Sequence, residues 1–338
     1  MPPSAMWCTG FLAIVCDLHG AGGGLTENNV PVLPVSLIIV SDYLTPDGDE
    51  ELRRALRAYA GDARGVPAET IIMLPSGHAS AIAAELDGKP AFSCPLVSVA
   101  THDSDESSQL KDAALAYCRN DLVAVVEADC MPRPGWLAAL FETIETEPRP
   151  DAVSGRTSYG GETMMKRVMA LLDRGFIERR DRRGKIIHVS NNGALYRKHV
   201  LERYRFEADH GPFVSSHLRQ HAMLRDGVAM EIATRAVSIH AYEGLGFIWD
   251  VRRNKGYQYA RMELLRKRAH TRLGLAYRAV KTSFKENRQT AQAVGKEFCR
   301  WTDWPLFWAM MILVRIPEFT GALAAGDPAA FKASTHYR

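Results

Sequence analysis

Short apolar runs alternate with amphipathic segments through the first third of the chain. The apolar runs are rich in β-branched residues, the pattern of strands buried on both faces of a sheet. They cover residues 35–40, 70–74, 95–100 and 122–126. Between them, apolar positions recur at helical spacing and predict helices over residues 49–60 and 107–118. Strand and helix therefore alternate, with short joints rich in Gly, Pro and Asp. This order predicts an α/β fold with a mostly parallel sheet flanked by helices.

Two carboxylates follow the last of these strands directly. Glu127 and Asp129 stand one residue apart after the run 122–126. Because side chains alternate along a strand, both carboxylates should point the same way, at the edge of the sheet where open α/β sheets bind ligands. Paired carboxylates repel each other and favour a cation, and hard oxygen ligands suit Mg²⁺ or Mn²⁺ beside a diphosphate. The alternative is a solvated acidic turn without a ligand.

Composition and charge narrow the class of protein. The chain of 338 residues is 46% hydrophobic and 24% charged, an ordinary globular balance. Its six Cys form no CxxC pair, which argues against a structural zinc or a disulfide scaffold and fits a reducing compartment. Residues 243–300 carry 14 Lys and Arg against 5 Asp and Glu, a balance of +9 in a chain of net charge +3. This region should meet an anionic partner, but it lacks the aromatic platform and reader motifs of nucleic-acid binding.

Both ends of the chain raise the question of a membrane. The apolar run at residues 11–16 is short and has no Lys or Arg before it, so it does not predict a secretory signal. The Gly-rich stretch 19–24 lacks the helix that a dinucleotide loop requires. Residues 304–314 form an apolar run of 11, shorter than the ~20 residues of a membrane span. With its two Trp and the basic region before it, this run fits either an interfacial helix or a core helix.

Several segments, taken in order, resemble the family 2 glycosyltransferases of the exopolysaccharide- or lipid-directed type. These segments are 35–43, 107–137, 153–159, 188–201, 217–240 and 249–262. The resemblance implies a GT-A fold, which is Rossmann-like, over residues 35–242. It leaves residues 1–34 as an extension and 243–338 as a basic, helical C-terminal region.

The implied activity is metal-dependent, inverting transfer of a sugar from a nucleotide-diphosphate donor to a glycan or lipid-linked hydroxyl acceptor. The cofactor would be Mn²⁺ or Mg²⁺. The product would belong to polysaccharide biosynthesis, and we expect a cytoplasmic protein, peripheral at the inner face of the membrane.

The resemblance also implies site residues. Asp129 would bind the metal that holds the donor diphosphate, with Glu127 near the ribose and metal, and His240 would complete the metal shell. Lys111 and Arg253 would contact the donor, although Lys111 could equally lie on a solvated helix face.

Two positions depart from the family pattern. The end of the second strand has Leu74, Pro75 and Ser76, where relatives have an Asp that reads the base, so Asp42 becomes the candidate for base or ribose contact. Ser215 and Ser216 replace the acidic pair that supplies the catalytic base. The nearest substitutes for that base are Glu207, Asp209 and His217.

Two other classes stay open on the sequence. A catalytically degenerate homologue would bind sugar nucleotide without efficient transfer. A nucleotidyltransferase would want a Gly- and Arg-rich phosphate loop after the first strand, and residues 41–50 contain no Lys or Arg.

Overall fold

A computed structural model describes residues 30–41, 48–76, 86–104, 106–207, 211–240, 244–266 and 271–325. The expectations for residues 11–16 and 19–24, and those for Asp42 and Asp209, fall outside these ranges.

The described strands form one nine-stranded sheet in the order β3-β4-β2-β1-β5-β8-β7-β9-β6. The strands are β1 Val32–Val40, β2 Val66–Pro75, β3 Lys89–Ala91, β4 Cys94–His102, β5 Leu122–Glu127, β6 Cys130–Pro132, β7 Ala152–Ser158, β8 Ala194–Arg197 and β9 Met230–His240. The run β4-β2-β1-β5 is parallel throughout, while β8 is antiparallel to both of its neighbours. The predicted α/β fold is confirmed, and the four predicted strands correspond to β1, β2, β4 and β5.

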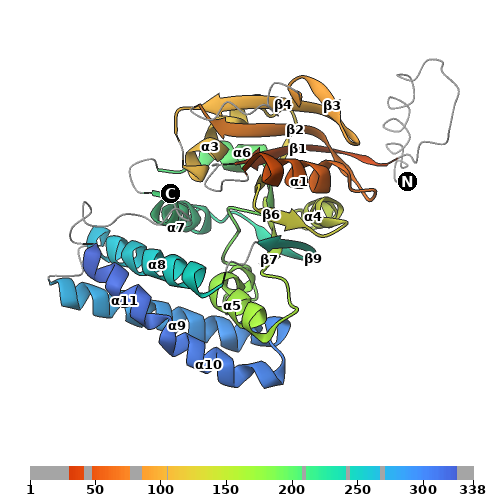
Figure 1. The fold of residues 1–338 in the computed structure, drawn as a ribbon. Coiled ribbons are helices and arrows are strands. Elements are labelled where there is room, and N and C mark those ends of the chain that lie inside the picture. Colours follow the sequence, from red (N-terminus) through yellow and green to blue (C-terminus); the bar gives the residue numbers. More distant parts are fainter. Residues whose placement is uncertain are drawn as a thin grey trace, which may run out of the picture.

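Helices cover the sheet and extend beyond it (Figure 1). They are α1 Gly48–Ala60, α3 Ser107–Ala114, α4 Trp136–Glu145, α5 Met164–Arg174, α6 Lys198–Arg203, α7 Gly211–Arg225, α8 Leu245–Leu265, α9 Arg272–Phe298, α10 Trp304–Leu313 and α11 Arg315–Ala324. The predicted helix over 107–118 is α3 followed by a 3₁₀ turn at Leu115–Tyr117.

Alternation along the central strands supplies two hydrophobic cores. On β1, Leu37 and Ile39 pack against α1 and α4 on one face of the sheet. Ile38 and Val40 pack against α3, α6 and α7 on the other face. Both sets of side chains are buried because helices cover both faces, which explains why the strand is a continuous apolar run.

The C-terminal helices form a separate layer against α5 (Figure 1). α8, α9 and α11 pack together, and α10 packs on α5 in a core that includes Phe307 and Met311. Arg252 is fully buried in this layer, where it pairs with Asp173 at 2.5 Å and with Glu318 at 3.0 Å. The buried ion pairs tie α5, α8 and α11 into one unit.

Residues Trp301–Ala324 are the one helical stretch of the described chain that is long and apolar enough to span a membrane. Their mean hydropathy is 1.4, and 44% of the apolar window is buried in the protein. The stretch exceeds the predicted run 304–314 because α10 continues almost directly into α11.

Two glycines set the distance between α8 and α11. A Cβ added at Gly321 would lie 1.8 Å from the carbonyl oxygen of Arg253, and one at Gly256 would lie 1.9 Å from that of Glu318. We expect Gly321→Ala to lower the free energy of unfolding by about 3 kcal/mol, because backbone atoms must move apart. Urea unfolding followed by circular dichroism measures this effect.

Gly246→Ala is the matched control for that substitution, because it also lies in a helix but has no atom within 4 Å of the added Cβ. This control should be neutral or slightly stabilising. Equal unfolding midpoints for the two variants would contradict the close packing of α8 on α11.

Candidate active site

A cavity of about 300 Å³ opens at the carboxyl ends of β1 and β5. Its lining comes from the loop after β5, from α3, α7 and α8, and from the segment before β8. Its polar and aromatic lining includes Ser107, Lys111, Glu127, Asp129, Asp173, Arg174, His188, Asn192, Ser216, His217, His240, Phe247, Asn254, Lys255 and Gln258. Most of the residues predicted from the sequence are therefore brought to one place.

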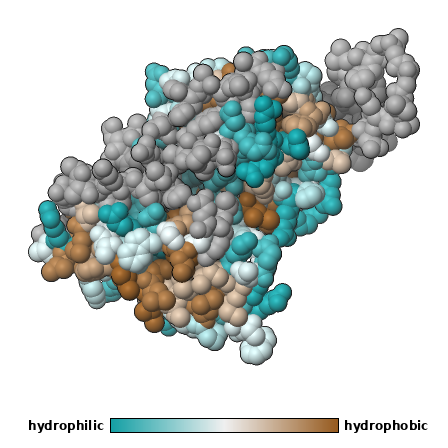
Figure 2. All heavy atoms as spheres, viewed as in Figure 1, coloured by the Kyte–Doolittle hydropathy of each residue, from teal (hydrophilic) through white to brown (hydrophobic). Residues whose placement is uncertain are grey.

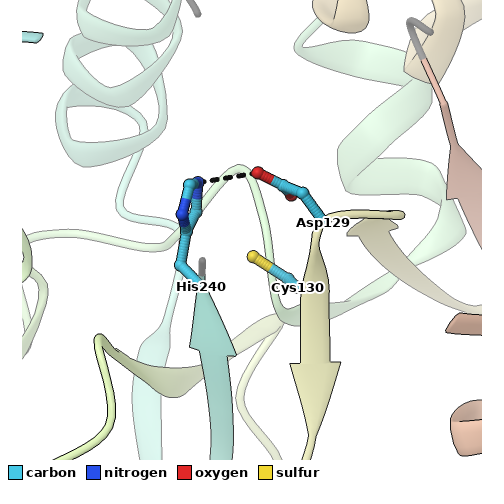
Figure 3. Close-up of side chains that lie close together, drawn as sticks. All are labelled: Asp129, Cys130 and His240. Atoms are coloured by element: carbon cyan, nitrogen blue, oxygen red, sulfur yellow. Dashed lines mark ion pairs between the residues drawn. The ribbon is translucent and has the colours of Figure 1, made fainter. Parts of the chain in front are cut away.

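Asp129 and His240 meet because β6 runs antiparallel to β9, with Cys130 opposite His240. The Oδ2 atom of Asp129 lies 2.8 Å from Nε2 of His240 (Figure 3). Ligand atoms of these two residues and Cys130 all lie within 4.8 Å of one another. The imidazole packs against the rings of Tyr159 and Phe247, at centroid distances of 5.9 and 6.0 Å, and these two rings also contact each other.

The electrostatics of Asp129 suit a cation. Burial alone would raise the pKa of Asp129, but the paired His240 and the Arg174 guanidinium lower it to about 2. The second oxygen, Oδ1, is buried and has no hydrogen-bond partner among the described residues. A carboxylate oxygen without a hydrogen-bond partner among the described residues, next to an imidazole, is a suitable ligand for Mn²⁺ or Mg²⁺.

Glu127 has a different environment from Asp129. It accepts hydrogen bonds from Asn192 Nδ2 at 2.7 Å and Ser107 Oγ at 3.1 Å, and it forms a close ion pair with Lys111. Asn192 also accepts the backbone N–H of Glu127 at 2.9 Å. Glu127 and Lys111 thus neutralise each other on the cavity wall, an arrangement that the sequence analysis did not predict.

His217 lies in the cavity wall on α7. Its Nδ1 is 3.1 Å from the carbonyl oxygen of Phe213, and its ring packs against Phe213 and Tyr259. An N–H at Nδ1 donates to that carbonyl, which leaves the lone pair on Nε2. Burial lowers the pKa of His217 below its ordinary value, so the imidazole is neutral at neutral pH.

The other predicted residues lie elsewhere. Glu207 is exposed, and its backbone carbonyl accepts the Ser215 hydroxyl. Arg253 is half-buried on α8, and neither Glu207 nor Arg253 is among the described residues that line the cavity. Their predicted roles stay predictions.

Sequence reasoning missed the contribution of α8. Asn254, Lys255 and Gln258 line the cavity, although the sequence assigned them to a separate basic region. The available signal was the resemblance of residues 249–262 to the family, but α8 reaches the cavity only through tertiary packing. Asn192 was also missed. The adjacent pair Asn191 and Asn192, within a segment that resembles the family, was the available signal.

Comparison with known proteins agrees with this geometry. Residues 91–205 match the sequence model of the family described as Glycosyl transferase family 2. Among solved structures, the chain is similar to mannosyltransferase PcManGT from Pyrobaculum calidifontis in complex with GDP-Man and Mn²⁺. The TM-score is 0.54 at 12% sequence identity, over 87% of each chain. No curated protein matches the sequence.

The fold and the family match define the protein as a glycosyltransferase with the GT-A fold. The match over residues 91–205 is to family 2 of the glycosyltransferases, the family that the sequence resembles. The family match favours glycosyl transfer over the nucleotidyltransferase alternative.

Proposed function

We propose that the protein transfers a sugar, with inversion, from a nucleotide-diphosphate donor to a hydroxyl acceptor. The observation that carries this proposal is Asp129, paired with His240 and with Oδ1 unpartnered, in the wall of the cavity. The similar structure binds GDP-Man and Mn²⁺, which supports a sugar nucleotide as donor. Residues 35–242 would form the catalytic domain, and the described helices α8 to α11 of the region 243–338 pack beside it.

Asp129 and His240 would hold Mn²⁺ or Mg²⁺. When bound, this ion neutralises charge on the leaving diphosphate. Lys111, Ser107 and Glu127 lie where the cavity reaches α3 and would face the donor. Asp42 and Arg253 remain predicted donor contacts.

His217 is the base that this geometry supports best. The acceptor oxygen attacks the anomeric carbon as the bond from that carbon to the diphosphate oxygen breaks, and the bonding electrons leave with the diphosphate. The hydroxyl proton passes to Nε2 of His217. A single displacement of this kind inverts the anomeric centre. Of the other candidates for the base, Glu207 is exposed, and Asp209 stays a prediction.

A thermal-shift panel tests the proposed function on the full-length protein. Nucleotide diphosphates and sugar nucleotides are added singly, with and without Mn²⁺. We expect at least one nucleotide to raise Tm in a manner that requires Mn²⁺, because a ligand that binds only the folded state stabilises it. The absence of any nucleotide shift, with or without metal, would refute the proposal.

The C-terminal layer has a surface suited to the inner face of a membrane. Trp301, Trp308, Ile312 and Ile316 are exposed at helical spacing, and Trp301 is 84% exposed. Figure 2 shows hydrophobic residues gathered over the C-terminal helices. α9 adds exposed basic residues, namely Arg278, Lys281, Lys285, Arg288 and Lys296. Apolar and basic side chains together favour an anionic bilayer and hence a lipid-linked or envelope glycan acceptor.

Vesicle flotation tests this membrane contact. The full-length protein should float with vesicles containing phosphatidylserine at low salt and should float less at high salt. Absence of flotation with anionic vesicles at low salt would contradict it.

A further inference from the structure

Helix α8 runs along the cavity from the metal site toward His217. Near its start, the Phe247 ring packs on the His240 ring, with centroids 6.0 Å apart. Toward its end, the Tyr259 ring contacts the His217 ring at 6.2 Å. Lys255 lies eight residues beyond Phe247, which is about 12 Å along a helix. Lys255 therefore belongs to the His217 end of the cavity.

Three carboxylates act electrostatically on Lys255, and each of them interacts with another side chain. Asp173 pairs with Arg252 at 2.5 Å. Glu318 pairs with Arg252 at 3.0 Å and with Arg315 at 2.7 Å. The remaining carboxylate, Glu286, accepts a hydrogen bond from the Tyr259 hydroxyl.

The ammonium group of Lys255 has no ion pair or hydrogen bond with any residue that the structure describes. Its recorded contact is with the Tyr259 ring, whose centroid is 5.9 Å from Nζ. Burial, and next the nearby Arg252 charge, lower the pKa of Lys255 to about 8. A cation in this environment is costly unless an anion approaches it.

The neighbouring groups also suit a polar ligand. Gln258 and Asn254 line the same part of the cavity on α8. His188 faces it as well, and burial is the main cause that lowers the pKa of His188 to about 3, so this imidazole is neutral. Among the described cavity-lining residues of α8, Lys255 is therefore the cationic one, with neutral imidazole and amide groups near it.

We infer that Lys255 binds an anionic group of the acceptor, a phosphate or a carboxylate, and so places the acceptor hydroxyl at His217. This inference rests on the proposed function. The donor diphosphate belongs at Asp129, next to Phe247, at the opposite end of this stretch of α8. An uncharged glycan acceptor would need only a neutral side chain at position 255 for its binding. The acceptor class is thus a sugar phosphate, including one that is lipid-linked, or a uronic acid.

Calorimetric titration of the full-length protein tests the inference. The protein is first loaded with Mn²⁺ and the nucleotide diphosphate that gives the largest thermal shift. Glucose 6-phosphate, glucuronic acid and glucose are then titrated separately. We expect one or both anionic probes to bind at least about tenfold more tightly than glucose, as a charge-assisted contact provides. Whichever of glucose 6-phosphate and glucuronic acid binds more tightly shows whether the site prefers a phosphate or a carboxylate.

Variants assign that preference to one side chain. Lys255→Gln should abolish the preference for the anionic probes while keeping Tm and nucleotide affinity. Lys285→Gln, an exposed lysine on α9, should keep the preference. Equal affinities for anionic probes and glucose in the wild type would overturn the inference, and so would an unchanged preference in Lys255→Gln. Weaker nucleotide binding in Lys255→Gln would also overturn it, because the lysine would then serve the donor. Failure of nucleotide binding in the wild type would instead refute the proposed function itself.

Discussion

Asp129→Asn should abolish the Mn²⁺-dependent thermal shift with nucleotide diphosphates and lower the rate of sugar transfer by about 10³-fold. The substitution keeps the shape of the side chain but removes the charge that would hold the metal. Metal stabilisation of a leaving diphosphate contributes several kcal/mol, and about 4 kcal/mol corresponds to that factor. Differential scanning fluorimetry and an assay of released nucleotide measure the two effects.

Asp181→Asn is a suitable control, because Asp181 is an exposed carboxylate outside the cavity lining. It should retain both the metal-dependent shift and the activity. If Asp129→Asn kept its full Mn²⁺-dependent shift, the acidic site after β5 could not be the metal site.

His217→Gln should lower kcat by about 10²- to 10⁴-fold, the usual contribution of a general base. Donor binding should not change, because His217 lies on α7, whereas Asp129 follows β5 and His240 ends β9. The pH profile separates a base from a structural residue. The pKa of His217 is lowered by burial, so the wild-type imidazole is neutral at pH 7. Wild-type kcat should therefore fall only below about pH 6.5, where this imidazole takes up a proton.

In His217→Gln that acidic limb should disappear along with most of the rate. His221→Gln, one turn further along α7 and exposed, should keep both. An acidic limb that persisted unchanged in His217→Gln would assign the proton transfer to another group.

Much of the proposed metal site follows from local sequence. The apolar run before Glu127 predicts a buried strand, and a strand of an open sheet delivers its last residues to the ligand-binding edge. The resemblance to the family added His240, a residue more than one hundred positions away from Asp129. The structure places these two side chains 2.8 Å apart, because β6 and β9 pair next to the loop that carries Asp129.

The partners of Glu127 were not predictable in the same way. Its ion pair with Lys111 joins residues 16 positions apart, and its bond with Asn192 joins residues 65 apart. Hydrophobic periodicity shows which face of a helix is buried. It does not show which polar side chain of another segment will contact a carboxylate at the end of a strand. The difference between Asp129, which pairs with His240, and Glu127, which Lys111 neutralises, therefore appears only in three dimensions.

The sequence by itself determined the central strands β1, β2, β4 and β5, the helices α1 and α3, and the position of Glu127 and Asp129 after β5, because periodicity and chain direction act over a few residues. The tertiary structure alone decided that α8 closes the cavity, that Lys255 has no carboxylate partner among the described residues, and that His217 turns its ring into the same space. Those arrangements depend on how α5, α7, α8 and α11 pack around Gly256, Gly321 and the buried Arg252. Packing of this kind joins distant segments whose positions no local pattern encodes.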